Sequence, residues 1–169
     1  MREQDISESI NSPEFKKWFG DSKAVDKKGK PKPFYHGTTK DKDFPAFKNL
    51  RDFGIWFTDN REDAGEYGMD SPDYDSYGGK KNTSGRVIPA YLSYKNPYKM
   101  TRADALEVRD ADEKGRLRTV QKKILLRAKN EGHDAVEFYS VNYLTDKMAQ
   151  YATVVFDPKQ IKSPFNKGT

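Results

Sequence analysis

The chain contains no cysteine and only two histidines, His36 and His133, among its 169 residues. The missing cysteines exclude a disulfide framework and any Cys-based metal site, and two histidines are too few for a His-rich metal centre. No N-terminal stretch has the apolar run of a signal peptide, and none reaches the roughly 20 apolar residues of a membrane-spanning helix. We therefore expect a cytoplasmic protein that needs no metal.

Hydrophobic residues are also scarce, at 34% of the chain, whereas aromatic residues reach 13%. Burial must therefore depend on Tyr, Phe and Trp, which combine a large apolar surface with polar groups. The length suits a single domain over residues 1–169, with residues 1–11 expected to be a flexible N-terminal segment. The net charge of +5 favours contact with polyanions, although a soluble, generally basic surface explains it better.

Capping and turn residues divide the first half of the chain into short elements. Ser12, Pro13 and Glu14 suit the start of a helix, and Gly20 suits its end. We expect strands over residues 34–38 and 54–58, followed by a helix from residue 59 or 60 to about residue 67. Residues 69–84 have no hydrophobic periodicity and are expected to form a loop.

The second half of the chain has a clearer helical pattern. A strand is expected over residues 86–94, at an edge or bulge because it contains Pro89. A helical turn is expected over residues 101–108, and apolar residues three or four apart predict a helix over residues 112–130. Further strands are expected over residues 135–139 and 153–156, with a loop at residues 139–150 between them.

Three segments carry residues that suit a chemical site: Tyr35 to Thr38, Gly54 to Tyr67 and Tyr151 to Pro158. Taken singly, His36 is as well explained by a structural hydrogen bond as by a function. Trp56 and Tyr67 could face each other across a slot, but core packing explains an aromatic pair equally well. The third segment alone indicates only a buried strand.

In this order, the three segments resemble the His-Tyr-Glu class of ADP-ribosyltransferases, which includes diphtheria toxin and the poly(ADP-ribose) polymerases. His36-Gly37-Thr38 resembles the first motif, and residues 54–67 resemble the second, including the eleven-residue interval from Trp56 to Tyr67. The wider chain, from residues 13–22 through 160–163, is similar to ADP-ribosyltransferase domains of polyvalent proteins in phages and mobile elements. The resemblance covers nearly the full length.

This resemblance implies an α+β fold in which split, mainly antiparallel sheets surround an NAD cleft and the helices lie outside. His36 would bond a ribose of NAD, backbone groups of Gly37 would hold the nicotinamide carboxamide, and Trp56 and Tyr67 would stack on the pyridinium ring. The implied cofactor-binding set also includes Thr38, Phe57 and Ala64. Trp56 replaces the usual tyrosine of the family, and Ala64 replaces a serine found in polymerase relatives.

The most serious departure is Ala152, five residues before Asp157, where the resemblance implies a catalytic glutamate. The implied catalytic positions are therefore His36, Trp56 and Ala152. A methyl group cannot stabilise the positive charge that develops on the ribose, and losing one such group commonly costs about 10²- to 10³-fold in turnover. The alanine fits either a natural pseudoenzyme or an engineered Glu→Ala change in a toxic transferase, and we favour the engineered change.

The implied activity is mono-ADP-ribosyl transfer by a toxin or phage-defence effector, with a neutralising antitoxin as a candidate partner. Tyr143, Lys147 and Gln150 are candidate acceptor-binding residues, and the net positive charge favours a nucleic-acid acceptor slightly over a protein. Two alternatives remain open. In the first, the chain is a non-catalytic module that binds NAD or ADP-ribose. In the second, it is an NAD glycohydrolase that uses water as the acceptor.

Overall fold

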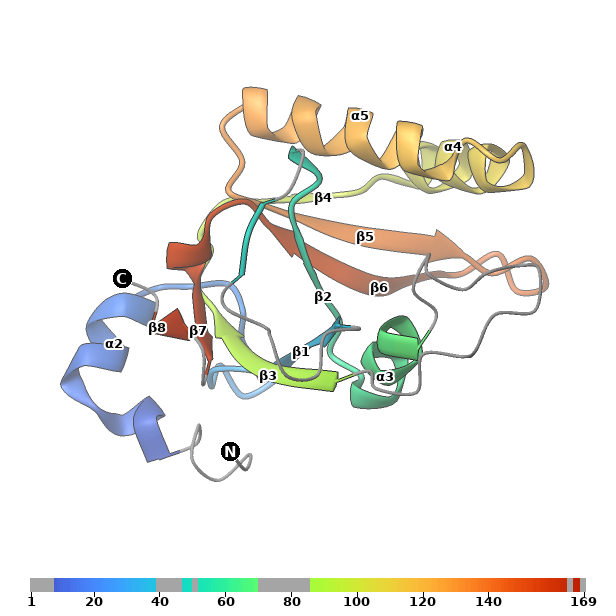
Figure 1. The fold of residues 1–169 in the computed structure, drawn as a ribbon. Coiled ribbons are helices and arrows are strands. Elements are labelled where there is room, and N and C mark those ends of the chain that lie inside the picture. The colour runs from blue at the N-terminus through green and yellow to red at the C-terminus, as the bar shows by residue number, and fades with distance from the viewer. Residues whose placement is uncertain (1–7, 39–46, 50–51, 70–85, 164–165, 168–169) are drawn as a thin grey trace.

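The computed structural model describes residues 8–38, 47–49, 52–69, 86–163 and 166–167, except for the side chains of residues 8, 9, 66–69, 166 and 167. In this part of the chain eight strands form two sheets (Figure 1). Sheet I has the order β1-β3-β7-β8, and sheet II has the order β2-β6-β5-β4. The strands of sheet I are β1 (Phe34–Thr38), β3 (Arg86–Leu92), β7 (Ile161–Ser163) and β8 (Asn166–Lys167). The strands of sheet II are β2 (Ile55–Phe57), β4 (Pro97–Lys99), β5 (Ala135–Val141) and β6 (Met148–Val155).

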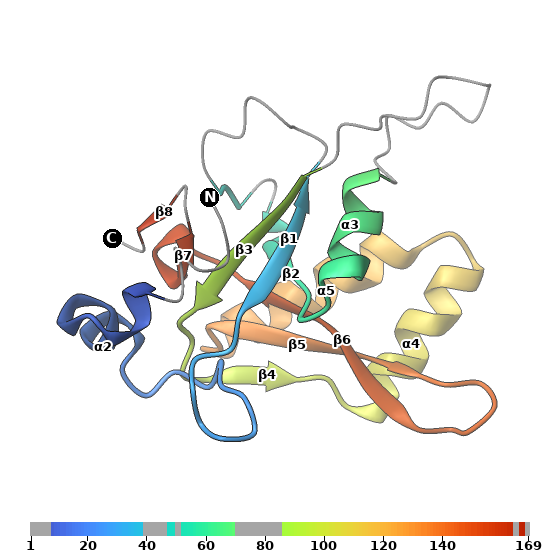
Figure 2. The same ribbon diagram turned by 90° about the horizontal axis from the view of Figure 1, so that it is seen from below.

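The helices lie on the outside of the two sheets. Figures 1 and 2 show α4 and α5 over one face of sheet II, sheet I towards its other face, and α2 beyond β7 and β8. All strand pairs are antiparallel except β4 with β5, whose parallel pairing is possible because α4 and α5 provide the crossover between them. The helices are α2 (Pro13–Phe19), α3 (Arg61–Met69), α4 (Arg102–Glu113) and α5 (Leu117–Asn130), with short 3₁₀ turns η1 (Glu8–Asn11) and η3 (Pro158–Gln160).

Two hydrophobic clusters hold these layers together, and the alternation of side chains along β6 connects them. Ala152 and Val154 belong to the cluster between sheet II and the helices α4 and α5, together with Phe138. Val155 points to the opposite face and packs in the cluster between the two sheets, which also contains Ile55 and Ile88. Sheet II is therefore buried on both faces.

Several local predictions are confirmed. The first predicted strand has the bounds of β1, and α2 begins where expected because the Ser12 hydroxyl accepts a hydrogen bond from the Phe15 amide at 3.1 Å. Gly20 ends α2 with a positive φ of 52°, a conformation that glycine adopts at little cost. The strand and helix predicted over residues 54–67 are β2 and α3, each within about two residues of the prediction.

Pro89 lies neither in an edge strand nor at a bulge, so that prediction is wrong. Its strand, β3, lies inside sheet I rather than at an edge. However, β7 pairs only with Tyr91 and Leu92, so in the described structure it stops short of Pro89. On the other side Pro89 lies opposite Tyr35, whose amide and carbonyl both bond to Thr58 instead of to β3. The missing N–H of Pro89 therefore removes no ladder hydrogen bond.

Two predicted boundaries are wrong. The helix expected over residues 112–130 is interrupted, because α4 continues to Glu113 and α5 begins only at Leu117. Gly115, with a φ of 69°, lies in the turn between them. The loop expected at residues 139–150 is a hairpin in which β5 extends to Val141 and β6 begins at Met148, so only residues 142–147 form the turn. The loop predicted at residues 69–84 lies almost entirely outside the described residues.

Candidate functional site

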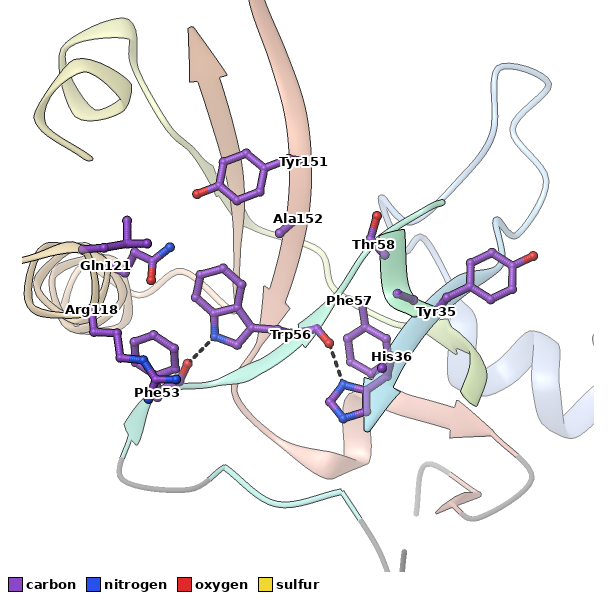
Figure 3. A pocket seen from close by; sticks show the side chains of 13 residues that line it. Tyr35, His36, Phe53, Trp56, Phe57, Thr58, Arg118, Gln121, Tyr151 and Ala152 are labelled. Carbon is purple, nitrogen blue, oxygen red and sulfur yellow. Dashed lines mark hydrogen bonds between the residues drawn. The ribbon is translucent and has the colours of Figure 1, made fainter. Parts of the chain in front are cut away.

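The site lies where β2 leaves sheet II. From Ile55 to Phe57, β2 pairs with β6, and the last pair is Phe57 with Thr153. The next residue, Thr58, instead exchanges backbone hydrogen bonds of 2.7 and 2.9 Å with Tyr35 of β1. The two sheets are joined at this point, and β6 has no partner from β2 at its next residue, Ala152. The divergence of the strands opens a cavity beside Ala152 (Figure 3).

The cavity has a volume of about 320 Å³, and its lining is mainly apolar with several aromatic rings. This volume falls at the lower end of the range for small-molecule sites, roughly 300–1,000 Å³. Its walls come from β1, β2, β6, α3, α5 and the residues before β2, so segments far apart in the sequence meet here. The lining residues are Tyr35, His36, Gly37, Phe53, Trp56, Phe57, Thr58, Ala64, Leu117, Arg118, Gln121, Tyr151 and Ala152.

His36 is held in one tautomer by the backbone of β2. Its Nδ1 lies 2.7 Å from the carbonyl oxygen of Trp56, which can only accept, so Nδ1 carries the proton and Nε2 is the acceptor of the neutral ring. The rings of Phe47 and Phe57 pack against the imidazole at centroid distances of 5.3 and 5.5 Å. Burial lowers the pKa of His36, and the bond to Trp56 only partly opposes this shift. The imidazole is therefore neutral at pH 7.

The indole of Trp56 is fixed by contacts that require no ligand. Its Nε1 donates to the carbonyl of Phe53 at 2.7 Å, and its ring stacks on that of Phe53 with centroids 5.3 Å apart. The ring of Phe138 packs against it at 4.7 Å from β5. Figure 3 shows the indole reaching from β2 towards Tyr151 and Ala152. An aromatic wall held in this way is preorganised, which reduces the entropy that a bound ring would otherwise cost.

Ala152 has an exposed fraction of only 6% and lies opposite Phe138 in the β5–β6 ladder. Figure 3 shows its methyl group directed into the cavity near Trp56. A carboxylate in its place would be buried against the cavity, where few water molecules would screen its charge. The position thus suits a group that stabilises positive charge, and the alanine provides none.

Comparison with known proteins agrees with this geometry. The family model described as ADP-Ribosyltransferase in polyvalent proteins matches residues 26–169. The chain belongs to this family. The match includes every strand described above and all the residues around the cavity. No curated protein matches the chain, and no solved structure does.

The cavity of this ADP-ribosyltransferase family member brings together six of the residues predicted from sequence: His36, Gly37, Trp56, Phe57, Ala64 and Ala152. Thr38 ends β1 but is not among the lining residues. Tyr67 lies in α3, and its side chain is outside the part that the structure describes. The predicted stacking of Trp56 and Tyr67 on one ring therefore stays a prediction.

The three predicted acceptor residues lie on the β5–β6 hairpin but face different surroundings. Tyr143 is 68% exposed in the turn, where its hydroxyl donates to Glu113 at 2.9 Å and the Arg109 guanidinium lies 4.5 Å from its ring centre. Lys147 is exposed at the end of the same turn. Gln150 lies on β6 rather than in a loop, and its amide donates to the Thr153 hydroxyl at 2.9 Å. The structure does not gather these three residues into one site.

Sequence reasoning missed the wall that α5 contributes. Leu117, Arg118 and Gln121 line the cavity from this helix, and Phe53 and Tyr151 flank Trp56 from the loop and from β6. The four-residue interval from Leu117 to Gln121 places both on one helical face. That interval was visible in the sequence, but nothing in it indicates that the face lies beside β6.

Within the ranges described, no group of three or more His, Asp or Glu side chains is arranged to hold a metal ion. In the same part of the chain, no helix combines the length and apolarity needed to cross a membrane.

Proposed function

We propose that the chain is a mono-ADP-ribosyltransferase that uses NAD as its co-substrate, with Ala152 at the position of the catalytic glutamate. One observation carries this proposal: the Ala152 methyl faces an aromatic cavity at the point where β2 leaves β6, together with His36, Gly37 and Trp56. Membership of the ADP-ribosyltransferase family supports the reaction class.

The proposed arrangement of NAD follows from the chemistry of the cavity walls. The nicotinamide ring packs against Trp56, because an aromatic face attracts the positively charged pyridinium. Its carboxamide binds the backbone of Gly37, where no side chain blocks the approach. The Nε2 acceptor of neutral His36 suits a ribose hydroxyl donor. When nicotinamide departs, positive charge develops on the ribose carbon, and the acceptor attacks that carbon from the opposite face.

Arg118 suits the pyrophosphate of NAD. It is exposed at the cavity rim on α5, and its guanidinium lies 5.8 Å from the ring centre of Phe53. Among the described residues it forms no ion pair, so its charge is available to a ligand. Arginine matches the geometry of phosphate oxygens with two parallel N–H donors.

Ala152 separates binding from chemistry in this proposal. The cavity keeps the walls that hold NAD, but it lacks the carboxylate that stabilises the developing charge, at a cost of about 10²- to 10³-fold in turnover. We favour an engineered Glu→Ala change in a cytoplasmic toxin or phage-defence effector that an antitoxin neutralises. If the alanine is natural, the chain is instead a binding module for NAD or ADP-ribose. The observation that favours this second function is the absence of a carboxylate at position 152.

The decisive experiment restores the carboxylate. Ala152→Glu and its uncharged control Ala152→Gln are incubated with NAD labelled in the adenylate and with whole-cell lysate, and the products are digested separately with nuclease and protease. We expect Ala152→Glu alone to label a macromolecule at about 10²- to 10³-fold the rate of the unaltered chain, and the label to be nuclease-sensitive. Equal, background labelling by all three proteins without loss of NAD would support the binding module, whereas release of free ADP-ribose without labelling would support the glycohydrolase.

A further inference from the structure

Gln121 is a buried amide whose hydrogen-bonding capacity is not used within the described structure. Its exposed fraction is 8%, and it makes no side-chain hydrogen bond with any described residue. Every fully buried side-chain nitrogen or oxygen atom among the described residues has a hydrogen-bond partner. Because the amide of Gln121 has none, its atoms are not fully buried and must reach the cavity surface. Figure 3 shows this amide pointing from α5 towards Trp56 and Ala152. A polar group left without a partner in such a place is costly unless a ligand or water binds it.

Gln121 also lies at the junction of two cavities. A second cavity of about 330 Å³ adjoins the first, and the two share Leu117, Gln121 and Tyr151. The second cavity extends between α4 and the β5–β6 hairpin to Tyr139 and Tyr143. NAD placed against Gly37 and His36 occupies the first cavity. The second cavity is not lined by Ala152 but reaches Tyr151, the residue before it, and so offers space for a second ligand beside the first.

The walls of the second cavity favour a flat, uncharged ring. Three tyrosines, Tyr139, Tyr143 and Tyr151, line it, and aromatic side chains of this kind stack on nucleobases. Arg109, which lies over Tyr143, and Asp112 both line this wall, so their opposite charges give a cationic acceptor such as an arginine or lysine side chain no net attraction. At the junction, the amide of Gln121 offers both a donor and an acceptor, which matches the edge of a base.

We propose that the second cavity is the acceptor subsite, that it binds a nucleobase of a single-stranded nucleic acid, and that Gln121 reads the edge of this base. This inference rests on the proposed function, because it assigns NAD to the first cavity. It adds a specificity-determining residue on α5 that faces the reacting centre from the side opposite His36. The phosphates of such a strand would meet a chain whose net charge is +5.

The test uses the chain as it stands, with alanine at position 152, so that NAD is bound but hardly consumed. Calorimetric titrations in saturating NAD compare the four nucleoside 5′-monophosphates with agmatine, which stands for an arginine side chain. We expect one or more nucleotides to bind and agmatine not to bind. Gln121→Leu, which keeps the size and removes the amide, should weaken the preferred nucleotide by about 5- to 100-fold. Gln121→Glu should also change the order of preference among the bases, because it replaces a donor by an acceptor.

Lys122→Ala is the matched control on the same helix, since Lys122 is exposed and lines neither cavity. Circular dichroism verifies the fold of each variant, and Gln121→Glu remains informative if Gln121→Leu unfolds. Nucleotide binding that Gln121 variants leave unchanged, or preferential binding of agmatine, would overturn the inference while the proposed function stands. If the chain does not bind NAD at all, the proposed function itself fails.

Discussion

Gly54 fixes the start of β2, and its replacement by alanine should disturb both the fold and the cavity. Its φ is +73°, a left-handed conformation that costs an alanine roughly 1–2 kcal/mol. An added Cβ would lie 2.2 Å from Cγ1 of Val154 and 3.3 Å from the carbonyl oxygen of Val155. Val154 is fully buried, so it cannot move away freely, and overpacking of this kind costs about 1–3 kcal/mol. We expect Gly54→Ala to lower the free energy of unfolding by about 2–5 kcal/mol.

Urea unfolding measures this loss, and Gly115→Ala provides the matched control. Gly115 has a similar φ of +69°, but an added Cβ there meets nothing within 4 Å. Gly115→Ala should therefore show only the backbone cost of roughly 1–2 kcal/mol. Because β2 carries Trp56, Gly54→Ala should also weaken NAD binding, whereas Gly115→Ala should not. Equal losses of stability in the two variants would refute the packing of β2 against β6.

Three further predictions concern buried polar groups. Asp104→Ala should lower the free energy of unfolding by about 2–4 kcal/mol, because its carboxylate completes the capping box with Thr101 at the start of α4 and accepts from Arg127 at 2.8 Å. Thermal unfolding measures this loss, and a loss below about 1 kcal/mol would contradict the network. Burial raises the pKa of Glu137, so its charge destabilises the fold as pH rises. Glu137→Gln should therefore increase the urea midpoint at pH 7 but not below about pH 4, and no gain at pH 7 would contradict this. The lowered pKa of His36 predicts that NAD affinity is constant from pH 8 to 6.5 and weakens only at lower pH, where the fold also loses stability. If calorimetry places the midpoint of the loss of NAD affinity above pH 6.5, the proposed contact of His36 with NAD is contradicted.

Local signals in the sequence were sufficient for the elements that hold the first two motifs. Strand β1, strand β2 and helix α3 were predicted because their determinants lie within a few residues of each other. Six of the motif residues, from His36 to Ala152, meet around one cavity, whereas Thr38 does not line it. The resemblance therefore named residues of β1, β2 and β6 that line this cavity, and their roles towards a ligand stay predictions.

The remainder depends on contacts between distant segments, which no local pattern specifies. Arg118 and Gln121 were missed because α5 faces the cavity only after α4 and α5 pack on sheet II. The break between these helices was expected before residue 112, but it lies at residues 114–116, where Gly115 has a positive φ. Gln150 was assigned to a loop because its pairing with Tyr139 across the hairpin is a contact that the local sequence does not specify.

Calorimetric titration of the unaltered chain with NAD, followed by chromatography of the NAD that remains, tests the central claim most directly. The account predicts one NAD bound per chain and almost no nicotinamide released, because Trp56 and His36 hold the ligand while Ala152 supplies no carboxylate. Trp56→Leu should abolish most of the binding, and Lys122→Ala should retain it. Absence of NAD binding at millimolar concentration, or binding that Trp56→Leu leaves unchanged, would contradict the account.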